Sequence, residues 1–152
     1  MKRVVLTAGA VLRGDDAAGP YLAKLLQDKP VEGIEVIDGG QTPEDDLGYI
    51  RKIDVDELIL FDAASMELAP GEMRILQEED VFSDYMMTTH SLPLSFLIAE
   101  LKSCCKCVIF VGIQPAHTDF MGALTPQVKE SCDAFYDILK SGADVESEIS
   151  KL

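Results

Sequence analysis

The fold class follows from MKRVVLTAGAVLRGDDAAGPYLAKLL (residues 1–26), where a β-branched run is followed by a helical pattern. Residues 3–7 form a short run that ends in small side chains, which is typical of a buried strand. A turn at Gly14-Asp15-Asp16 comes next, and apolar residues then recur at helical spacing: Ala18, Leu22, Leu25 and Leu26. A strand that leads through a turn into a helix is the repeating unit of an α/β protein.

The same alternation continues along the rest of the chain. Further strands are expected at residues 34–37, 57–61, 71–76 and 108–113, and further helices at about 43–53, 91–101 and 126–141. We therefore predict a three-layer α/β sandwich, in which helices flank both faces of a twisted, mostly parallel sheet of about five strands. One domain is expected over residues 1–142, followed by an acidic, flexible C-terminal tail at residues 143–152.

The formal net charge of −14 over 152 residues restricts the partners of the protein. A phosphate backbone would be repelled, so nucleic acid is not expected, whereas a basic protein segment or a bound cation is favoured. No apolar run approaches the ~20 residues of a membrane-spanning helix, and the N-terminus does not have the pattern of a secretory signal. We expect a cytoplasmic monomer without membrane insertion.

Three of the four cysteines are clustered, and Cys104 and Cys107 form a C-x-x-C pair. Such a pair can hold zinc or perform redox chemistry, but zinc sites need a second ligand pair that this sequence lacks. Cys104, Cys105 and Cys107 precede the expected strand at residues 108–113, and Cys132 lies on an apolar helix face. We interpret all four as ordinary reduced thiols.

Acidic side chains follow two strands that are expected to be neighbours. In open parallel sheets, ligands bind outside the carboxyl ends of the strands, at the point where the strand order reverses. If the order begins 2-1-3, Asp15 and Asp16 after the first strand and Asp62 after the third strand meet in one crevice. Each acid alone has a structural explanation as a helix cap or turn residue, but several carboxylates in one crevice repel each other unless they share a cation or a proton.

His90, one of two histidines, lies in the polar turn Thr88-Thr89-His90-Ser91 before an expected helix. An imidazole at the same rim as two carboxylates forms a mixed nitrogen and oxygen ligand set, which suits nickel, zinc, iron or manganese better than magnesium or calcium. The other histidine, His117, lies in a loop without a ligand pattern, and we interpret it as a surface residue. The sequence has no G-x-S-x-G elbow and no H-E-x-x-H helix.

These motifs together resemble the hydrogenase maturation endopeptidases over about residues 3–140, and within that family the type that serves hydrogenase 3. Five segments carry the resemblance by their combination and order: GAVLRGDDAAGP (9–20), IDGG (37–40), Asp62-Ala63, MMTTHSLP (86–93) and GIQP (112–115). The family usually has Asn where Ala10 stands and often Gly where Ala17 stands. Neither departure removes a ligand, but both are expected to alter loop shape and substrate fit.

The resemblance implies a twisted, mostly parallel sheet between helices and one endoproteolytic cut. That cut removes the C-terminal extension from a nickel–iron hydrogenase large-subunit precursor after nickel insertion. The family's three metal ligands fall on Asp16, Asp62 and His90. Nickel is then supplied by the precursor, and zinc or cadmium can take its place.

A further family aspartate, implicated in activity, falls on Asp38. Asp38 is expected either to act as a general base or to orient the turn at Gly39-Gly40. The remaining residues that we expect to contact the substrate are drawn from the same motifs: Asp15, Gly39, Gly40, Thr89 and Gln114.

Two other functions are compatible with parts of the pattern. A receiver domain also pairs two acids after its first strand with an aspartate after its third, but it needs a lysine after a late strand, where this chain has Ile113-Gln114-Pro115. It also leaves His90 unexplained. A non-catalytic nickel-binding checkpoint protein could use the same three ligands as the peptidase.

Overall fold

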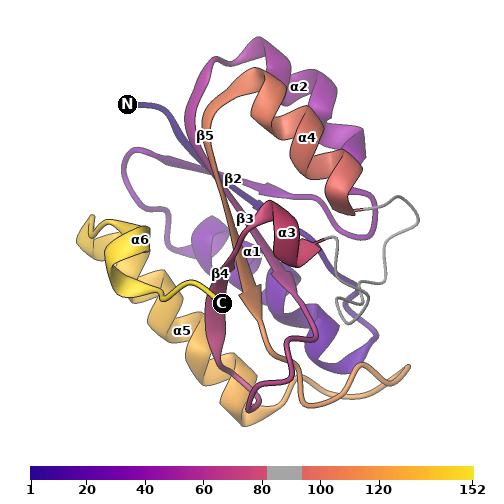
Figure 1. Cartoon of the computed structure of the whole chain (residues 1–152). Coiled ribbons are helices and arrows are strands. Elements are labelled where there is room, and N and C mark those ends of the chain that lie inside the picture. The colour runs from indigo at the N-terminus through magenta and orange to yellow at the C-terminus, as the bar shows by residue number, and fades with distance from the viewer. Residues whose placement is uncertain (82–93) are drawn as a thin grey trace.

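The computed structural model describes residues 1–81 and 94–152. In this part of the chain, five strands form one sheet in the order β2-β1-β3-β5-β4 (Figure 1). The strands are β1 (Arg3–Thr7), β2 (Ile34–Asp38), β3 (Val55–Ala63), β4 (Met73–Leu76) and β5 (Cys105–Ile113). All neighbours pair in parallel except β4, which pairs antiparallel with β5 at the edge. The predicted fold class is confirmed, and the order begins 2-1-3, the condition under which Asp16 and Asp62 are expected to meet.

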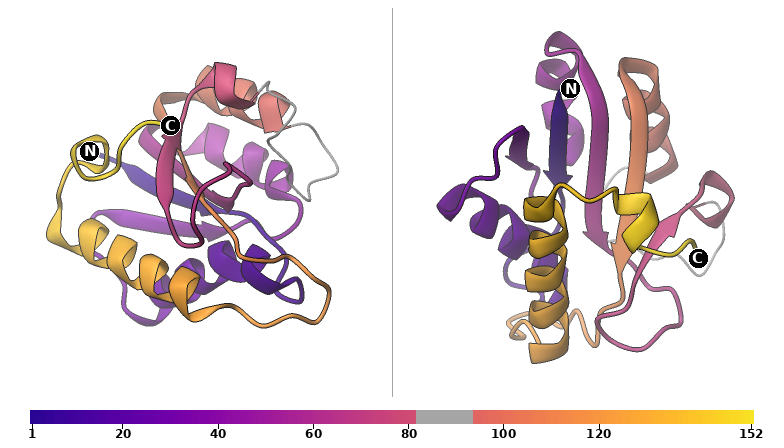
Figure 2. Two further views of the ribbon diagram at one scale, coloured as in Figure 1. Left: turned by 60° about the horizontal axis from the view of Figure 1, so that its bottom comes forward. Right: turned by 90° about the vertical axis from the view of Figure 1, so that its left-hand side faces the viewer.

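Two layers of helices cover the sheet (Figure 2). Helices α1 (Ala18–Asp28) and α5 (Pro126–Ser141) pack on one face, and α2 (Leu47–Lys52) and α4 (Leu94–Cys104) pack on the other. Because successive side chains of a strand point to opposite faces, each strand feeds both layers. In β3, Ile59 and Phe61 pack toward α1 and α5, whereas Leu58 and Leu60 pack toward α2 and α4. Both faces being covered explains why the strands read as continuous apolar runs.

One aromatic pair ties α5 to the centre of the sheet. The rings of Phe61 on β3 and Phe135 on α5 stack with their centroids 5.2 Å apart. Such a pair contributes about 0.5–1.5 kcal/mol beyond the burial of its area. Helix α5 begins at Pro126 and ends before Gly142, whose φ of 77° is the left-handed conformation that favours glycine. Both ends of α5 therefore agree with the sequence.

Four short helical segments complete the described fold, two of them 3-10 turns. These turns are η1 (Gly14–Ala17) and η2 (Pro43–Asp46), which lead directly into α1 and α2. Thr42 stands at the N-cap position of η2 but makes no capping hydrogen bond with its side chain. The other two segments are α3 (Glu78–Val81) and α6 (Val145–Glu148). No helix within the two described ranges is long and apolar enough to cross a membrane.

Residues 143–152 differ from the flexible tail expected from the sequence. Val145 of α6 is fully buried and Ile149 is nearly so, and both belong to the core on the α1/α5 face. The backbone N–H of Ile75 donates to Ser150 (2.8 Å), and that of Leu152 donates to the carbonyl of Ile75 (3.0 Å). Figure 1 shows the C-terminus beside β4. The tail therefore packs on the domain and covers the outer edge of β4.

Candidate active site at the carboxyl ends of the strands

The site lies at the carboxyl ends of β1 and β3, where the strand order reverses. Thr7 at the end of β1 pairs with Phe61 of β3, so Asp62 lies one residue beyond this pair. The turn η1, which carries Asp15 and Asp16, packs against β3. The carboxylates of Asp16 and Asp62 are both nearly inaccessible, with residues 3% and 1% exposed. Two of the three expected metal ligands are therefore brought to adjoining elements at one end of the sheet.

Asp16 also fixes the loop that follows β1. Its Oδ2 accepts a hydrogen bond from the backbone N–H of Ala10 (2.9 Å). Gly9 in this loop has a φ of 144°, and a Cβ there would lie 2.0 Å from the carbonyl oxygen of Asp16. This close approach of the two backbones explains why glycine stands at position 9. The hydrogen bond from Ala10 orients the Asp16 carboxylate.

The third expected ligand cannot be located, because His90 lies outside the described residues, as does Thr89. Within residues 1–81 and 94–152, no group of three or more histidine, cysteine or acidic side chains is arranged to hold a metal ion. The meeting of Asp16, Asp62 and His90 stays a prediction.

Asp15 has a structural role in the fold, and its expected substrate contact stays a prediction. It is fully buried, and its Oδ2 accepts from the backbone N–H of Ala116 (2.8 Å). Its Oδ1 accepts from both the backbone N–H (2.7 Å) and the hydroxyl (2.9 Å) of Thr125. Asp15 thus anchors both ends of the loop between β5 and α5 to η1.

Gln114 combines a structural contact with a place in the site. Its Oε1 accepts from the backbone N–H groups of Met66 (2.6 Å) and Leu68 (3.3 Å), and this holds the segment after β3. It also lines a hollow of about 400 Å³, which we call the Asp16 hollow. The lining of the Asp16 hollow comes from three segments: Arg13, Asp16, Ala63–Ser65 and Gln114–Thr118.

Asp38 is the last residue of β2, and it lines a second hollow of about 430 Å³, which we call the Asp38 hollow. Its Oδ1 accepts from the backbone N–H of Gly40 (3.2 Å), so it does orient the Gly39-Gly40 turn. A Cβ on Gly39 would lie 2.7 Å from the carbonyl oxygen of Thr7, and Gly40 has a φ of 57°. Both glycines are explained by this backbone geometry. Arg13 lines both hollows and so lies between them.

Negative charge accumulates beside Asp38. Burial raises the pKa of the Asp46 carboxyl, and the nearby carboxylates of Asp45 and Asp38 add to the rise. A group of like charges at the surface favours an approaching cation or a basic segment.

Two residues of the site were missed by the sequence interpretation. His117 is half-buried and lines the Asp16 hollow, rather than lying apart on the surface. Its Nδ1 is buried without a hydrogen-bond partner among the described residues, as is Nε of Arg13. Arg13 directly precedes Gly14-Asp15-Asp16, and its charge within an acidic chain was the available signal.

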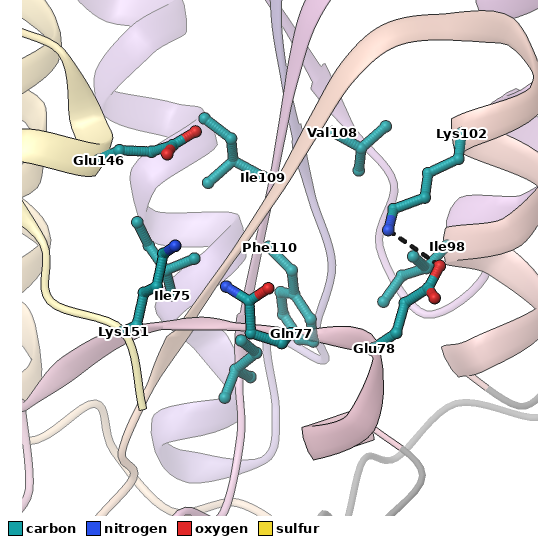
Figure 3. A pocket seen from close by; sticks show the side chains of 11 residues that line it. Ile75, Gln77, Glu78, Ile98, Lys102, Val108, Ile109, Phe110, Glu146 and Lys151 are labelled. Carbon is teal, nitrogen blue, oxygen red and sulfur yellow. Dashed lines mark hydrogen bonds and ion pairs between the residues drawn. The ribbon is translucent and has the colours of Figure 1, made fainter.

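A third hollow, of about 170 Å³, lies away from these residues, between β4, β5, α4 and α6 (Figure 3). Its polar lining includes Lys102, whose ammonium group is 2.9 Å from the carboxylate of Glu78. None of the acids at the carboxyl ends of the strands lines it.

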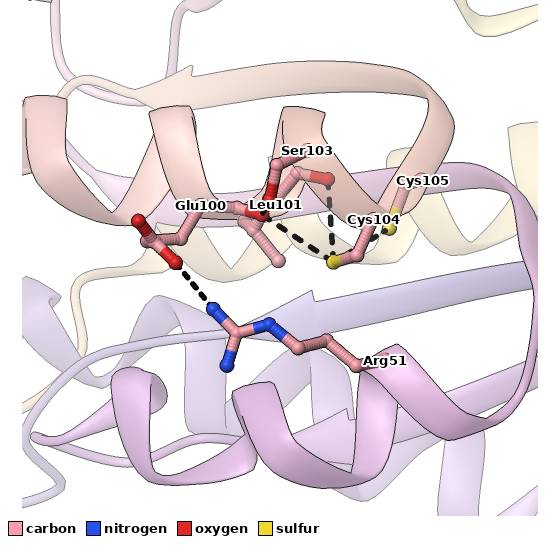
Figure 4. Close-up of polar contacts among 6 residues, drawn as sticks. All are labelled: Arg51, Glu100, Leu101, Ser103, Cys104 and Cys105. Carbon is pink, nitrogen blue, oxygen red and sulfur yellow. Dashed lines mark hydrogen bonds and ion pairs between the residues drawn. The ribbon is translucent and has the colours of Figure 1, made fainter.

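Three of the four cysteines, Cys104, Cys105 and Cys107, lie at the amino end of β5 (Figure 4), and Cys132 is buried on α5. All four are free, and the sulfurs of Cys104 and Cys105 are 3.9 Å apart. Burial, with a smaller contribution from Cys104, raises the pKa of the Cys105 thiol to about 12. Cys104, Cys105 and Cys107 thus lie at the start of a strand, as expected, and the reduced state of the thiols stays a prediction.

Comparisons with known proteins agree with this geometry. A family model described as hydrogenase maturation protease matches residues 20–141. The hydrogenase 3 maturation protease of Escherichia coli K12 is 41% identical over 140 residues, which cover 92% of this chain and 90% of that protein. A putative hydrogenase maturation protease of Methanocaldococcus jannaschii is 31% identical over 91% of this chain and 86% of its own length.

Solved structures show the same fold. The crystal structure of a hydrogenase 3 maturation protease superposes with a TM-score of 0.92 at 38% identity, covering 100% of this chain and 97% of the other. The solution structure of the endopeptidase HycI from Escherichia coli gives a TM-score of 0.91 at the same identity and coverage. This chain therefore belongs to the hydrogenase maturation protease family and is a hydrogenase maturation endopeptidase.

Proposed function

We propose that the protein removes the C-terminal extension from a nickel-loaded nickel–iron hydrogenase large-subunit precursor, and that Asp16, Asp62 and His90 bind the nickel of that precursor. Nickel in this proposal is part of the substrate. Zinc or cadmium would occupy the same ligands when nickel is absent.

The observation that carries the proposal is the burial of two carboxylates at the carboxyl ends of neighbouring strands. Asp16 and Asp62 are 3% and 1% exposed; Asp16 lies in the turn after β1, and Asp62 is the second-last residue of β3. Burial of like charges at one end of a sheet is less unfavourable when a cation or a proton is shared between them. Their oxygens and the nitrogen of His90 are a donor set that fits nickel or zinc.

Each side chain has a distinct task in the reaction. Asp16, held by Ala10, and Asp62, at the rigid end of β3, would orient the bound precursor so that its scissile bond lies beside them. A divalent ion held by Asp16, Asp62 and His90 would supply the electrophile that polarises the scissile carbonyl. Asp38 would remove a proton from the attacking water as general base.

The position of Asp38 is consistent with this task. It is exposed at the end of β2, on the other side of Arg13 from the Asp16 hollow. Its Oδ1 accepts a hydrogen bond from the backbone N–H of Gly40, which orients the side chain while leaving it exposed. A precursor segment lying across Arg13 would reach both hollows.

The test is cleavage of a nickel-loaded large-subunit precursor by the purified protein, followed by mass spectrometry of the product. We expect a shortened precursor and no cleavage of nickel-free precursor. His90→Ala and Asp62→Asn should each lower kcat/KM by more than about a hundredfold, since even the loss of an outer-shell partner costs ~10–100-fold at metal sites.

Asp56→Asn is the matched control for Asp62→Asn. Asp56 lies on the same strand at its amino end, where it accepts from the backbone N–H of Lys2 (2.6 Å). Cleavage by Asp56→Asn should equal that of the unmodified protein. If the unmodified protein bound the nickel-loaded precursor but left it full length, the checkpoint function would replace the peptidase function.

We also propose that this processing takes place in the cytoplasm and that the protein acts as a monomer. The four free cysteines fit a reducing compartment. Sedimentation at micromolar concentration would test the oligomeric state.

A further inference from the structure

Four large apolar side chains are exposed together beside the Asp38 hollow. They are Val11 (68% exposed), Leu12 (55%), Phe120 (68%) and Met121 (69%), and we call them the apolar rim. Only Tyr49 and Phe96 are comparably exposed elsewhere in the described chain, apart from residues at its two ends. Exposed apolar side chains that gather at one place mark interaction surfaces, whereas single ones need no explanation.

The apolar rim comes from two loops that are tied together. One loop follows β1 and the other joins β5 to α5, and the backbone N–H of Met121 donates to the carbonyl of Leu12 (2.6 Å). Gly14 N–H donates to Gly122 (3.1 Å), and Asp15 N–H donates to His117 (2.9 Å). In Figure 2 the orange loop after β5 reaches the end of the sheet where α1 begins. The rim is therefore part of a fixed surface.

The backbone of Met121 has an unusual conformation. Its φ is 66°, in the left-handed region that non-glycine residues seldom adopt. Such conformations persist where the surrounding structure determines them, and they cluster at ligand-binding sites. The hydrogen bond from Met121 to Leu12 is the contact that fixes this backbone.

The rim is continuous with the proposed site of cleavage. Val11, Leu12 and Phe120 line the Asp38 hollow together with Asp38 and Arg13. A neighbouring hollow of about 390 Å³ extends the apolar surface across Val11, Pro20 and Leu124, and it also reaches Asp38. A protein segment bound on the rim would therefore pass directly beside the carboxylate that we assign as general base.

We propose that the apolar rim is the docking surface for the large-subunit precursor and that it binds an apolar segment next to the cleaved bond. The proposal rests on the proposed function, since it takes the precursor as the partner. Arg13, which has no ion pair among the described residues, lies between the rim and the Asp16 hollow and would hold the carbonyl or carboxylate oxygens of the same segment.

The test compares Leu12→Ser/Phe120→Ser with Phe96→Ser. Phe96 is a matched control because it is 49% exposed on α4, outside the rim. Binding of a nickel-loaded precursor is measured by calorimetry and its cleavage by mass spectrometry. We expect the rim variant to bind about 10- to 100-fold more weakly, as when central apolar contacts of an interface are truncated, and Phe96→Ser to bind normally.

The outcomes separate the docking surface from the peptidase activity. If the unmodified protein cleaves the precursor and the rim variant binds and cleaves equally well, the docking proposal is wrong and the peptidase function stands. If the unmodified protein binds without cleaving while the rim variant loses binding, the peptidase function fails and the docking surface stands. A change in oligomeric state of the rim variant, with precursor binding intact, would assign the rim to self-association and overturn the proposal.

Discussion

Asp15 and Asp16 are adjacent in the sequence, yet their carboxylates contact different loops. Asp15 accepts hydrogen bonds from Ala116 and Thr125 in the loop before α5, and Asp16 accepts one from Ala10 after β1. Because the two residues lie in one 3-10 turn, their side chains point in different directions from a single rigid support. One acid thus assembles the loops, and the other lines the Asp16 hollow.

Replacing Asp15 should therefore reduce stability. In Asp15→Asn, one of the two carboxylate oxygens becomes an NH2 group. The backbone N–H of either Ala116 or Thr125 would then lose its acceptor. We expect the free energy of unfolding to fall by about 1–3 kcal/mol, measured by urea denaturation. Asp119→Asn, an exposed change in the same loop, should have no measurable effect. Equal stability of Asp15→Asn and the unmodified protein would mean that these hydrogen bonds do not hold the loop.

The sequence predicted the acids at the strand ends but could not separate their roles. The end of each strand follows from the alternation of apolar runs and turns, and this placed Asp16, Asp38 and Asp62 at the carboxyl ends of the strands. Which loop an acid contacts depends on partners 100 or more residues away, such as Thr125 for Asp15. His117 was misread for the same reason, because its neighbours Gly14 and Gly122 come together only in the fold.

At the level of elements, β4 shows how a sheet edge is completed by a distant segment. β4 pairs with β5 on one side, and residues 150–152 pair with Ile75 on the other. An open strand edge invites pairing with other chains, and covering it removes that risk. The acidic composition of the tail predicted flexibility, because Val145 and Ile149, although four residues apart as on one helix face, are too few to indicate a packed helix among polar neighbours.

Shortening one of these side chains tests the packing of the tail. Val145 is fully buried against α5, so Val145→Ala should lower the free energy of unfolding by about 1–2 kcal/mol, through lost burial and the cavity left behind. Glu148→Ala, an exposed change in the same helix, is the control and should change stability little. Differential calorimetry would measure both. An unchanged midpoint in Val145→Ala would restore the interpretation of a free tail.

For the whole molecule, part of the net charge of −14 is gathered at one end of the sheet. Much of it is solvated, but Asp16 and Asp62 are buried at the end of the sheet that also carries Asp38 and the apolar rim. The fold thus gathers acids and exposed apolar side chains at one end, as a site for a protein partner that carries a cation would require. Cys104, Cys105 and Cys107 lie at the opposite end of β5 from this site.

This arrangement predicts the response of the folded protein to divalent metals. A ligand that binds only the folded state stabilises it by RT ln(1 + [L]/Kd), which is about 2.7 kcal/mol when the ligand is present at 100 times its Kd. Nickel, zinc or cadmium should therefore raise the thermal midpoint of the precursor-free protein, and Asp16→Asn or Asp62→Asn should blunt the rise. Asp56→Asn, at the far end of β3, should respond as the unmodified protein does. If both site variants kept the full response, the metal would bind elsewhere, and the shared-cation explanation for the buried acids would have to be abandoned even if the protein cleaves its precursor.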